Sequence, residues 1–329
     1  MARRQGMPNN QYYAAVYGVS RLSKAIPTNT AASVKQRLLN RARAQKEDFN
    51  LLLTKYALER VLYRISQSPH RDLFVLKGAL LFELWTEQTH RPTRDADFLS
   101  KGENSLERFR KIFEEICALK VEDDGLRFDA ASVKVERIKE DQEYEGIRAT
   151  FLGYLENARL PVQIDVGFGD AITPAPIQTS FPTLLDSPAP TLLAYPRETV
   201  VAEKFEALVK LGMANTRMKD FHDLRTLSNL FPFEGPVLSE AIWRTFERRR
   251  TPLPTEAFPI ALTPEFYNDA TKQNQWNAFV SKNKLYIEPV TLPAVIASIQ
   301  AFVMPVLPSS AAENGPILQW KPGGPWKQV

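Results

Sequence analysis

Two aspartates stand one residue apart in the segment RPTRDADFLS (residues 91–100), which turns apolar directly after them. On a strand, Asp95 and Asp97 point to the same face, so both carboxylates can reach one cation or a close pair of cations. Asp and Glu make up 38 of the 329 residues, so this spacing also arises by chance. The segment therefore predicts either a metal-binding pair or two solvated surface charges.

A lysine and a glycine precede the aspartates in FVLKGALL (residues 74–81). We interpret this segment as a strand that ends at Lys77 and Gly78 and opens directly into a helix. A helix N-terminus behind a glycine turn offers free backbone N–H groups to a phosphate, and the lysine adds positive charge. The alternative is an ordinary turn between a strand and a helix.

A third aspartate of interest is Asp165, in the β-rich segment LPVQIDVGFGD (residues 160–170). Apolar residues alternate there with Gln163, Asp165 and Gly167, so the carboxylate lies on the face opposite the main apolar one. A charged group in that position needs either solvent or a cation. An exposed edge strand is the alternative to a metal ligand.

Lys204 occupies an unusual position in a predicted helix, RETVVAEKFEALVKLGM (residues 197–213). On a helical wheel it falls in the middle of the apolar arc and not on the polar side. The side chain therefore either extends to solvent from the rim of the core or reaches a phosphate site. The arc consists of Val200, Val201, Phe205, Leu208 and Leu211.

A charged motif, RMKDFHDL (residues 217–224), opens the next predicted helix. Arg217, Asp220 and Asp223 recur every three residues, so they can share one face of that helix, with Lys219 beside them. The simpler interpretation is a helix cap with a local ion pair.

The elements that must position these residues follow from the hydrophobic pattern, which predicts an α+β fold. Two helices lead into a core domain in which helices alternate with the strands of a small mixed sheet. Six prolines between residues 173 and 196 predict a connector with edge strands and a domain boundary. The predicted divisions are a loose tail at 1–25, the core at 26–180, a mainly helical C-terminal domain at 195–308 and a disordered tail at 309–329.

Composition narrows the classes of protein and of site. Hydrophobic residues make up 44% and charged residues 24%, which are globular proportions. No apolar run approaches the roughly 18 residues of a membrane span, and no secretory signal is recognisable, so we expect a cytoplasmic protein without a membrane partner. One cysteine and three histidines exclude an intrachain disulfide and a thiolate zinc cluster, and they favour a hard cation such as Mg²⁺. The net charge of +4 favours an anionic partner, either a nucleotide or a nucleic acid.

Taken in order, these motifs resemble those of the AbiEii/AbiGii toxin family of nucleotidyltransferases, a branch of the polymerase-β-like superfamily, over about residues 33–302. VLKGALL resembles the lysine–glycine strand end that opens the active-site helix, and RPTRDADFL resembles the segment with the paired acids. VVAEKFEALV and RMKDFHDL resemble the two helical motifs that follow, and Asp165 matches the third aspartate of the superfamily by context. The chain departs from the pattern at Ala79 and Leu80, where the family usually has a second glycine and then serine or threonine.

The resemblance implies a polymerase-β-like nucleotidyltransferase domain that uses two Mg²⁺ ions and a nucleoside triphosphate. Asp95, Asp97 and Asp165 would hold the metal, and Asp165 would help to deprotonate the attacking hydroxyl. Cations would neutralise the charge on the phosphate oxygens, and the backbone after Gly78 would cradle the phosphates. The residues predicted to act in catalysis are Asp95, Asp97, Asp165, Lys204 and Asp220. The residues predicted to contact or orient the nucleotide are Lys77, Gly78, Ala79, Arg217, Lys219 and Asp223.

The resemblance also implies biological partners. The acceptor would be an RNA, in particular the 3′ end of a transfer RNA, and the protein would be the toxin of a toxin–antitoxin or phage-defence pair, with a cognate antitoxin encoded nearby. The arginine run at 248–250, with Trp243 and Phe246, could bind RNA, or it could simply complement a helix dipole. Transfer to a small molecule or a protein hydroxyl, a non-catalytic nucleotide- or RNA-binding module, and a helical interaction protein remain the alternatives.

Overall fold

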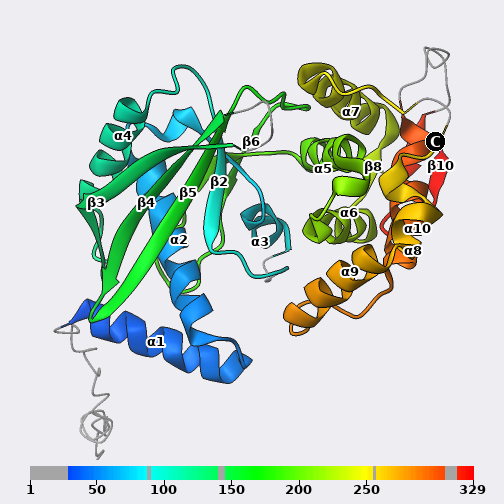
Figure 1. Cartoon of the computed structure of the whole chain (residues 1–329). Coiled ribbons are helices and arrows are strands. Elements are labelled where there is room, and N and C mark those ends of the chain that lie inside the picture. The colour runs from blue at the N-terminus through cyan, green and yellow to red at the C-terminus, as the bar shows by residue number, and fades with distance from the viewer. Residues whose placement is uncertain (1–28, 87–89, 140–144, 255–256, 308–316) are drawn as a thin grey trace, which may run out of the picture.

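The structure is a computed structural model, and it describes residues 29–86, 90–139, 145–254, 257–307 and 317–329. The predicted loose tail at 1–25 lies outside the described residues. Figure 1 shows a sheet-containing N-terminal half and a mainly helical C-terminal half. The α+β class predicted from the sequence is confirmed.

A seven-stranded mixed sheet, in the order β3-β4-β5-β2-β1-β7-β6, forms the framework of the N-terminal half. It is larger than the small sheet predicted, because β3 begins six residues before the predicted segment at 132–138 and because two strands lie in the proline-rich connector. One of these, β7, pairs in parallel with β1, so the sheet continues past residue 180, the predicted end of the core. The strands are β1 (Phe74–Lys77), β2 (Asp95–Ser100), β3 (Leu126–Lys139), β4 (Glu145–Leu155), β5 (Ala158–Phe168), β6 (Ile177–Ser180) and β7 (Thr191–Ala194).

Helices α2 (Phe49–Gln67) and α4 (Leu106–Ala118) cover one face of this sheet, and Figure 1 shows them behind it. Both begin where the sequence places a cap: Asp48 accepts from the Leu51 amide at 2.7 Å, and Ser105 accepts from the Arg108 amide at 3.3 Å. Phe98 of β2 is buried on the covered side, in an aromatic cluster with Phe74 that extends to α4. Since side chains alternate along a strand, the odd-numbered residues of β2 face the other way.

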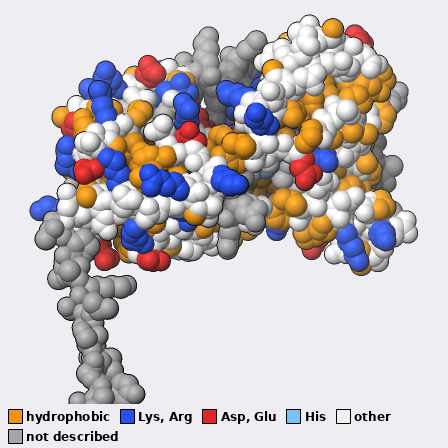
Figure 2. Space-filling view, turned by 90° about the horizontal axis from the view of Figure 1, so that it is seen from below, with side chains coloured by type: hydrophobic (Ala, Val, Ile, Leu, Met, Phe, Trp, Pro, Cys, Tyr) orange, Lys and Arg blue, Asp and Glu red, His pale blue; other side chains and the backbone are white. Residues whose placement is uncertain are grey.

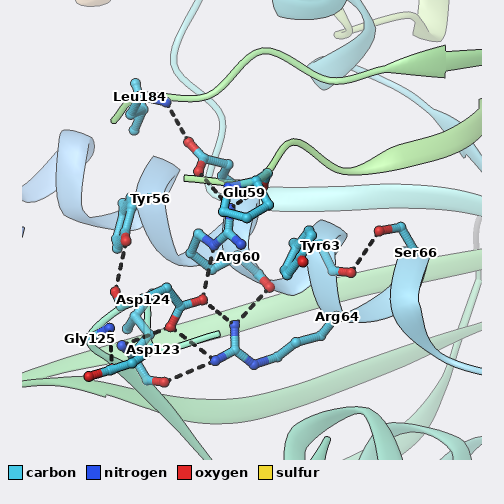
Figure 3. A network of polar contacts seen from close by, with 12 residues as sticks. Tyr56, Glu59, Arg60, Tyr63, Arg64, Ser66, Asp123, Asp124, Gly125 and Leu184 are labelled. Carbon is cyan, nitrogen blue, oxygen red and sulfur yellow. Dashed lines mark hydrogen bonds and ion pairs between the residues drawn. The ribbon is translucent and has the colours of Figure 1, made fainter. Parts of the chain in front are cut away.

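Buried charges fasten α2 to the turn before β3 (Figure 3). Asp124 accepts hydrogen bonds from Arg60 Nε at 2.9 Å and from Arg64 Nη1 at 2.7 Å, and its backbone carbonyl accepts from the Tyr56 hydroxyl at 2.8 Å. Burial opposes the charged form, but the two guanidinium groups outweigh it and lower the pKa of Asp124. Breaking such a buried pair leaves an uncompensated charge, which typically costs about 3–5 kcal/mol. The network therefore fixes the position of the helix that supports the sheet.

The C-terminal half consists mainly of helices that pack around α5 and α6. Helix α5 contacts α6 and α7, and α6 contacts α9 and α10. Short helices, η1 (Arg71–Leu73), η2 (Gly212–Ala214), η3 (Ile260–Leu262) and η4 (Met304–Val306), connect or extend the longer ones. The remaining helices are α1 (Thr30–Gln45), α3 (Leu80–Thr86), α5 (Arg197–Leu211), α6 (Met218–Leu230), α7 (Gly235–Arg249), α8 (Pro264–Asn268), α9 (Ala270–Lys282) and α10 (Leu292–Val303).

The prediction of a disordered tail at 309–329 is wrong for residues 317–329. Strands β9 (Leu318–Trp320) and β10 (Trp326–Gln328) form an antiparallel hairpin, and β9 pairs with β8 (Phe233–Glu234). Trp320 is 3% exposed and donates from Nε1 to the Ser228 carbonyl at 2.6 Å. Trp326 donates from Nε1 to the Phe302 carbonyl at 2.7 Å. These two large aromatic side chains, with their N–H groups hydrogen-bonded, supply the contact area that holds the short hairpin on the helices.

Within the described part of the chain, every helix is too short or too polar to cross a membrane.

Candidate active site

Three aspartates meet on the face of the sheet opposite α4. Strands β2 and β5 are parallel neighbours, and their register places Asp97 directly beside Asp165. One carboxylate oxygen from each of Asp95, Asp97 and Asp165 lies within 4.8 Å of the others. Asp95 and Asp97 thus share one face, and Asp165 is the third member of the group. We refer to these three residues as the aspartate triad.

Different partners hold two members of the aspartate triad. Thr93 Oγ1 donates to Asp95 Oδ1 at 2.6 Å. Arg148, from the neighbouring strand β4, donates hydrogen bonds to both carboxylate oxygens of Asp165, from Nε at 2.8 Å and from Nη2 at 2.7 Å. This bidentate geometry is the strongest form of an arginine–carboxylate pair. The pairing of Arg148 with Asp165 was not predicted from the sequence, because it depends on the register between β4 and β5, which only the structure gives.

Asp97 is the member whose charge is least well compensated. Burial raises its pKa from 3.8 to about 6, and the neighbouring Asp95 carboxylate acts in the same direction. Lys77 and Lys219 oppose that rise without cancelling it. A divalent cation would reverse the imbalance, because it favours the ionised carboxylate far more strongly than a single ammonium group does. The residues present therefore fit a hard cation in chemistry and in spacing.

The predicted turn after β1 brings the backbone against this carboxylate. Lys77 pairs with Asp97 across the antiparallel β1–β2 ladder, and Gly78 follows with φ +76°. A Cβ atom on Gly78 would lie 2.7 Å from Asp97 Cγ, closer than real contacts allow. Glycine is therefore required here both by the left-handed backbone and by the approach of the carboxylate. The helix that opens after the turn, α3, has only seven residues.

Lys204 lies between two buried aspartates of α6. Its Nζ is 2.7 Å from Asp220 Oδ1 and 2.8 Å from Asp223 Oδ2, and both carboxylates are fully buried. Burial alone would lower the pKa of Lys204, but the two carboxylates raise it. Arg217, which directly precedes α6, approaches the other oxygen of Asp220 with Nε at 2.7 Å, and this is the local ion pair of the simpler interpretation. Lys204 is thus explained by ion pairing across two helices and not by extension to solvent.

Arg91 is the most prominent residue that the sequence analysis missed. It binds Asp223 with Nε at 3.0 Å and Nη2 at 3.1 Å, and His90 Nε2 lies 2.9 Å from the same carboxylate. Burial opposes the charge on Asp223, but Arg91 and then Lys204 hold its pKa well below the usual range. Arg91 and Asp223 are 132 residues apart, so no local pattern could have paired them.

A pocket between the two halves collects most of the predicted nucleotide-contacting residues. Asp97 of the aspartate triad lies on its wall, and Asp223 lies behind it, reached through Arg91 and Lys204. The predicted residues that line it are Lys77, Gly78, Ala79, Asp97, Lys204, Arg217, Lys219 and Asp220, and lining residues not predicted include Arg91, Asp170, Tyr195, Glu203 and Arg249.

Residues 60–302 match the family model described as Nucleotidyl transferase AbiEii toxin, Type IV TA (toxin–antitoxin) system. The chain belongs to this family. The resemblance inferred from the motifs is confirmed, and with it the assignment to nucleotidyltransferase enzymes and to the toxins of type IV toxin–antitoxin systems. Membership implies an antitoxin partner.

Two solved structures from Helicobacter pylori are similar to this AbiEii-family chain. One is a candidate nucleotidyltransferase with 12% sequence identity and a TM-score of 0.45, covering 78% of this chain and 93% of that chain. The other is JHP933, with 14% identity and a TM-score of 0.43, covering 78% of this chain and 91% of that chain. No protein of curated function matches the sequence.

The RNA contact predicted for the arginine run at 248–250, with Trp243 and Phe246, is wrong for Phe246 and Arg249. Phe246, near the arginine run that ends α7, is 1% exposed and belongs to the core. Arg249 is 9% exposed, and its guanidinium lies within 3.6 Å of carboxylate oxygens from Asp170, Glu203 and Glu206. Neither side chain can also contact a nucleic acid, because Phe246 is buried in the core and Arg249 is bound to carboxylates of the protein. The position of the run at the helix end fits the alternative, a charge run that complements the helix dipole.

Proposed function

We propose that this AbiEii-family chain transfers a nucleotide from a nucleoside triphosphate to an acceptor hydroxyl at the aspartate triad. The observation that carries the proposal is the position of Asp97, which belongs to the triad and also lines a pocket rich in Lys and Arg. Acids that can hold a metal on one side and cations that can hold phosphates on the other are what nucleotidyl transfer requires.

Asp95, Asp97 and Asp165 would hold Mg²⁺. The ion would supply charge neutralisation on the phosphate oxygens and would lower the pKa of a bound hydroxyl. Two features of the protein support this assignment: the raised pKa of Asp97 and the 4.8 Å limit on the spacing of the carboxylate oxygens. Asp165 would also take up the proton of the acceptor hydroxyl, and Arg148 would keep its carboxylate oriented.

Cations along the pocket wall would bind the triphosphate. Lys77 is 6% exposed, and its Nζ lies 3.6 Å from Asp170 Oδ2, so it is a fixed charge at the pocket floor. Lys219 is exposed at the pocket mouth, and no other side chain of the described residues pairs with it within 4 Å. Arg217 stands beside it, tied to Asp220. These side chains, with the backbone at Gly78, would hold the phosphates without the hydroxyl that the family usually has after the turn.

Asp220 and Asp223 would act mainly as positioning residues, and Lys204 would be one of the cations that they position. Both carboxylates are fully buried and hold cations whose other faces line the pocket, namely Lys204, Arg217 and Arg91. Removing one carboxylate would leave a buried cation without its partner and would shift that cation away from the phosphates. The two acids of the Arg-x-Lys-Asp-x-x-Asp motif would thus serve the site mainly by holding these cations in place.

The acceptor would be an RNA, with the 3′ end of a transfer RNA as the specific proposal, and the antitoxin would be encoded nearby. The net charge of +4 supports an anionic acceptor over a neutral small molecule or a protein hydroxyl. Growth arrest by the toxin would follow from modification of this RNA.

Incubation with Mg²⁺, each labelled nucleoside triphosphate and total transfer RNA tests the proposal. Asp95→Ala and Asp97→Ala should each lower labelled product by about a hundredfold or more, because removal of one charge-stabilising group commonly costs that much. Asp186→Ala, at a fully exposed carboxylate, is the matched control and should react as the wild type does. Full activity in both triad variants would overturn the assignment. Tight nucleotide binding by the wild type without any turnover would favour the non-catalytic module.

A further inference from the structure

A row of polar side chains leads away from the aspartate triad across the open face of the sheet. Asp95 pairs with Gln163 on β5, Gln163 with Thr150 on β4, and Thr150 with Lys134 on β3. Residues that pair across neighbouring strands point to the same face, so the four side chains form one line. With strands about 4.8 Å apart, Lys134 on β3 lies roughly 14 Å from Asp95 on β2.

Three members of this row, Gln163, Thr150 and Lys134, line a groove that is separate from the nucleotide pocket. The groove lies between the start of α2 and strands β3 to β5, and Arg94, Lys134 and Arg159 line it together with Gln163, Thr150 and the apolar Leu51. No Asp or Glu is among its lining residues. The three cations are exposed, and within the described ranges none of them has an ion pair or a side-chain hydrogen bond. Figure 2 shows Lys and Arg side chains, with hydrophobic ones among them, over this half of the molecule.

The geometry of phosphoryl transfer relates the groove to the reaction. The attacking and leaving oxygens lie roughly in line through the phosphorus atom, so acceptor and pyrophosphate must be on opposite sides of it. Lys77 and Lys219, proposed to bind the leaving phosphates, line the pocket together with Asp97. Gln163, the neighbour of Asp95 on β5, lines the groove and not that pocket, so the groove approaches the triad from outside the pocket. This step rests on the function proposed above, whereas the charge and exposure of the groove do not.

We propose that the groove binds the single-stranded end of an RNA acceptor, with its terminal hydroxyl at the aspartate triad. Phosphates would lie along Arg94, Lys134 and Arg159, because unpaired exposed cations bind phosphates at no cost in broken ion pairs. The apolar side chain of Leu51 can contact the faces of bases in a single strand. In a duplex these faces are covered by the neighbouring base pairs. Gln163 and Thr150 can donate hydrogen bonds to the sugar or the backbone.

Charge reversal in the groove tests the proposal by binding alone, without turnover. The variant carries Lys134→Glu and Arg159→Glu, and the probe is a short fluorescein-labelled single-stranded RNA whose anisotropy is followed from low to high salt. We expect affinity to fall on the order of tenfold or more. The slope of log affinity against log salt should become shallower by about 0.7 for each lost phosphate contact. A second variant, Lys134→Gln with Arg159→Gln, should show the same change in slope with a smaller loss.

The matched control reverses two exposed cations on the covered side of the same half, Arg110→Glu and Lys120→Glu on and just after α4. It should bind the RNA as the wild type does. Mg²⁺-dependent thermal stabilisation by nucleotide should be the same in all variants, which shows that they fold and separates this test from the proposed chemistry.

Three outcomes would overturn the groove proposal while leaving nucleotidyl transfer intact. The first is wild-type RNA affinity in the groove variant, and the second is an equal loss in the control variant. The third is competition by poly-glutamate or by blunt duplex RNA as effective as that by the single strand, which would assign the groove to an acidic polypeptide or to paired RNA. Conversely, a wild type that binds RNA through the groove but never transfers a nucleotide would refute the proposed function alone.

Discussion

Replacing Asp97 by asparagine should make the metal-free protein more stable while abolishing its function. The folded environment raises the pKa of this carboxyl from 3.8 to about 6, so the folded state binds the proton more tightly than the unfolded chain does. Stability therefore falls as the pH rises from about 4 through about 6, and the loss is complete above that range. At about 1.36 kcal/mol per pH unit, the shift corresponds to about 3 kcal/mol.

The assay is guanidinium unfolding of wild type and Asp97→Asn in the presence of EDTA at several pH values. Asparagine has nearly the same shape but cannot ionise, so the variant does not carry the cost of the buried charge. The stability difference in its favour should grow from near zero below pH 4 to about 3 kcal/mol above pH 7. Asp186→Asn, at a fully exposed carboxylate, should change stability by less than about 1 kcal/mol at every pH.

Mg²⁺ should then reverse the order of the two proteins. At a thousand times its dissociation constant, a ligand that binds only the folded state stabilises it by about 4.1 kcal/mol, which exceeds the roughly 3 kcal/mol advantage of the metal-free variant, and the variant should lose most of that gain. The reasoning is refuted if metal-free Asp97→Asn is less stable than the wild type at pH 8, or if the difference between them does not change with pH.

Three further substitutions test separate parts of the structure by their effect on unfolding. Gly78→Ala should destabilise the protein by more than the roughly 1–2 kcal/mol of a left-handed alanine, because the new Cβ also meets the Asp97 carboxylate. Gly323→Ala should show the backbone cost alone, because Gly323 has φ +81° and nothing within 4 Å of the added Cβ. Equal losses in the two variants would contradict the steric argument. Lys204→Met should cost about 3–5 kcal/mol by leaving two buried carboxylates short of a partner, and a neutral result would show that the pair adds nothing. Trp320→Ala should lower the free energy of unfolding by about 3–5 kcal/mol, because the side chain is buried. Trp243→Ala, at a half-exposed side chain, should lower it by less than about 1 kcal/mol. If the C-terminal segment were disordered, both changes would be equally mild.

Local patterns predicted the parts of the site that lie within single elements. The same-face geometry of Asp95 and Asp97 follows from the two-residue period of a strand, and the Arg217–Asp220 pair follows from the period of a helix. The turn at Gly78 follows from a glycine between a strand pattern and a helix pattern. The proline-rich connector was predicted to contain edge strands, and β6 is one, whereas β7 lies inside the sheet between β1 and β6.

Pairings between distant elements could not be predicted in this way. The C-terminal hairpin was assigned to disorder, because two three-residue strands joined by a turn rich in Gly and Pro have weak propensity. They depend on Trp320 and Trp326 binding to helices elsewhere in the chain. The arginine run resembled a nucleic-acid contact until Arg249 was found among carboxylates from other segments.

The sequence by itself determined the family, the order of the motifs and the residue types that the chemistry needs, because these depend on spacing along one chain. Only the tertiary structure decided how each charge is held. Arg91 and Lys204 are positioned at the pocket by aspartates of α6, and Arg148 is bound to Asp165, whereas Arg94 in the groove keeps an exposed guanidinium. The physical reason is that the free energy of a charge depends on its burial and its neighbours, and both are set by contacts between residues many positions apart.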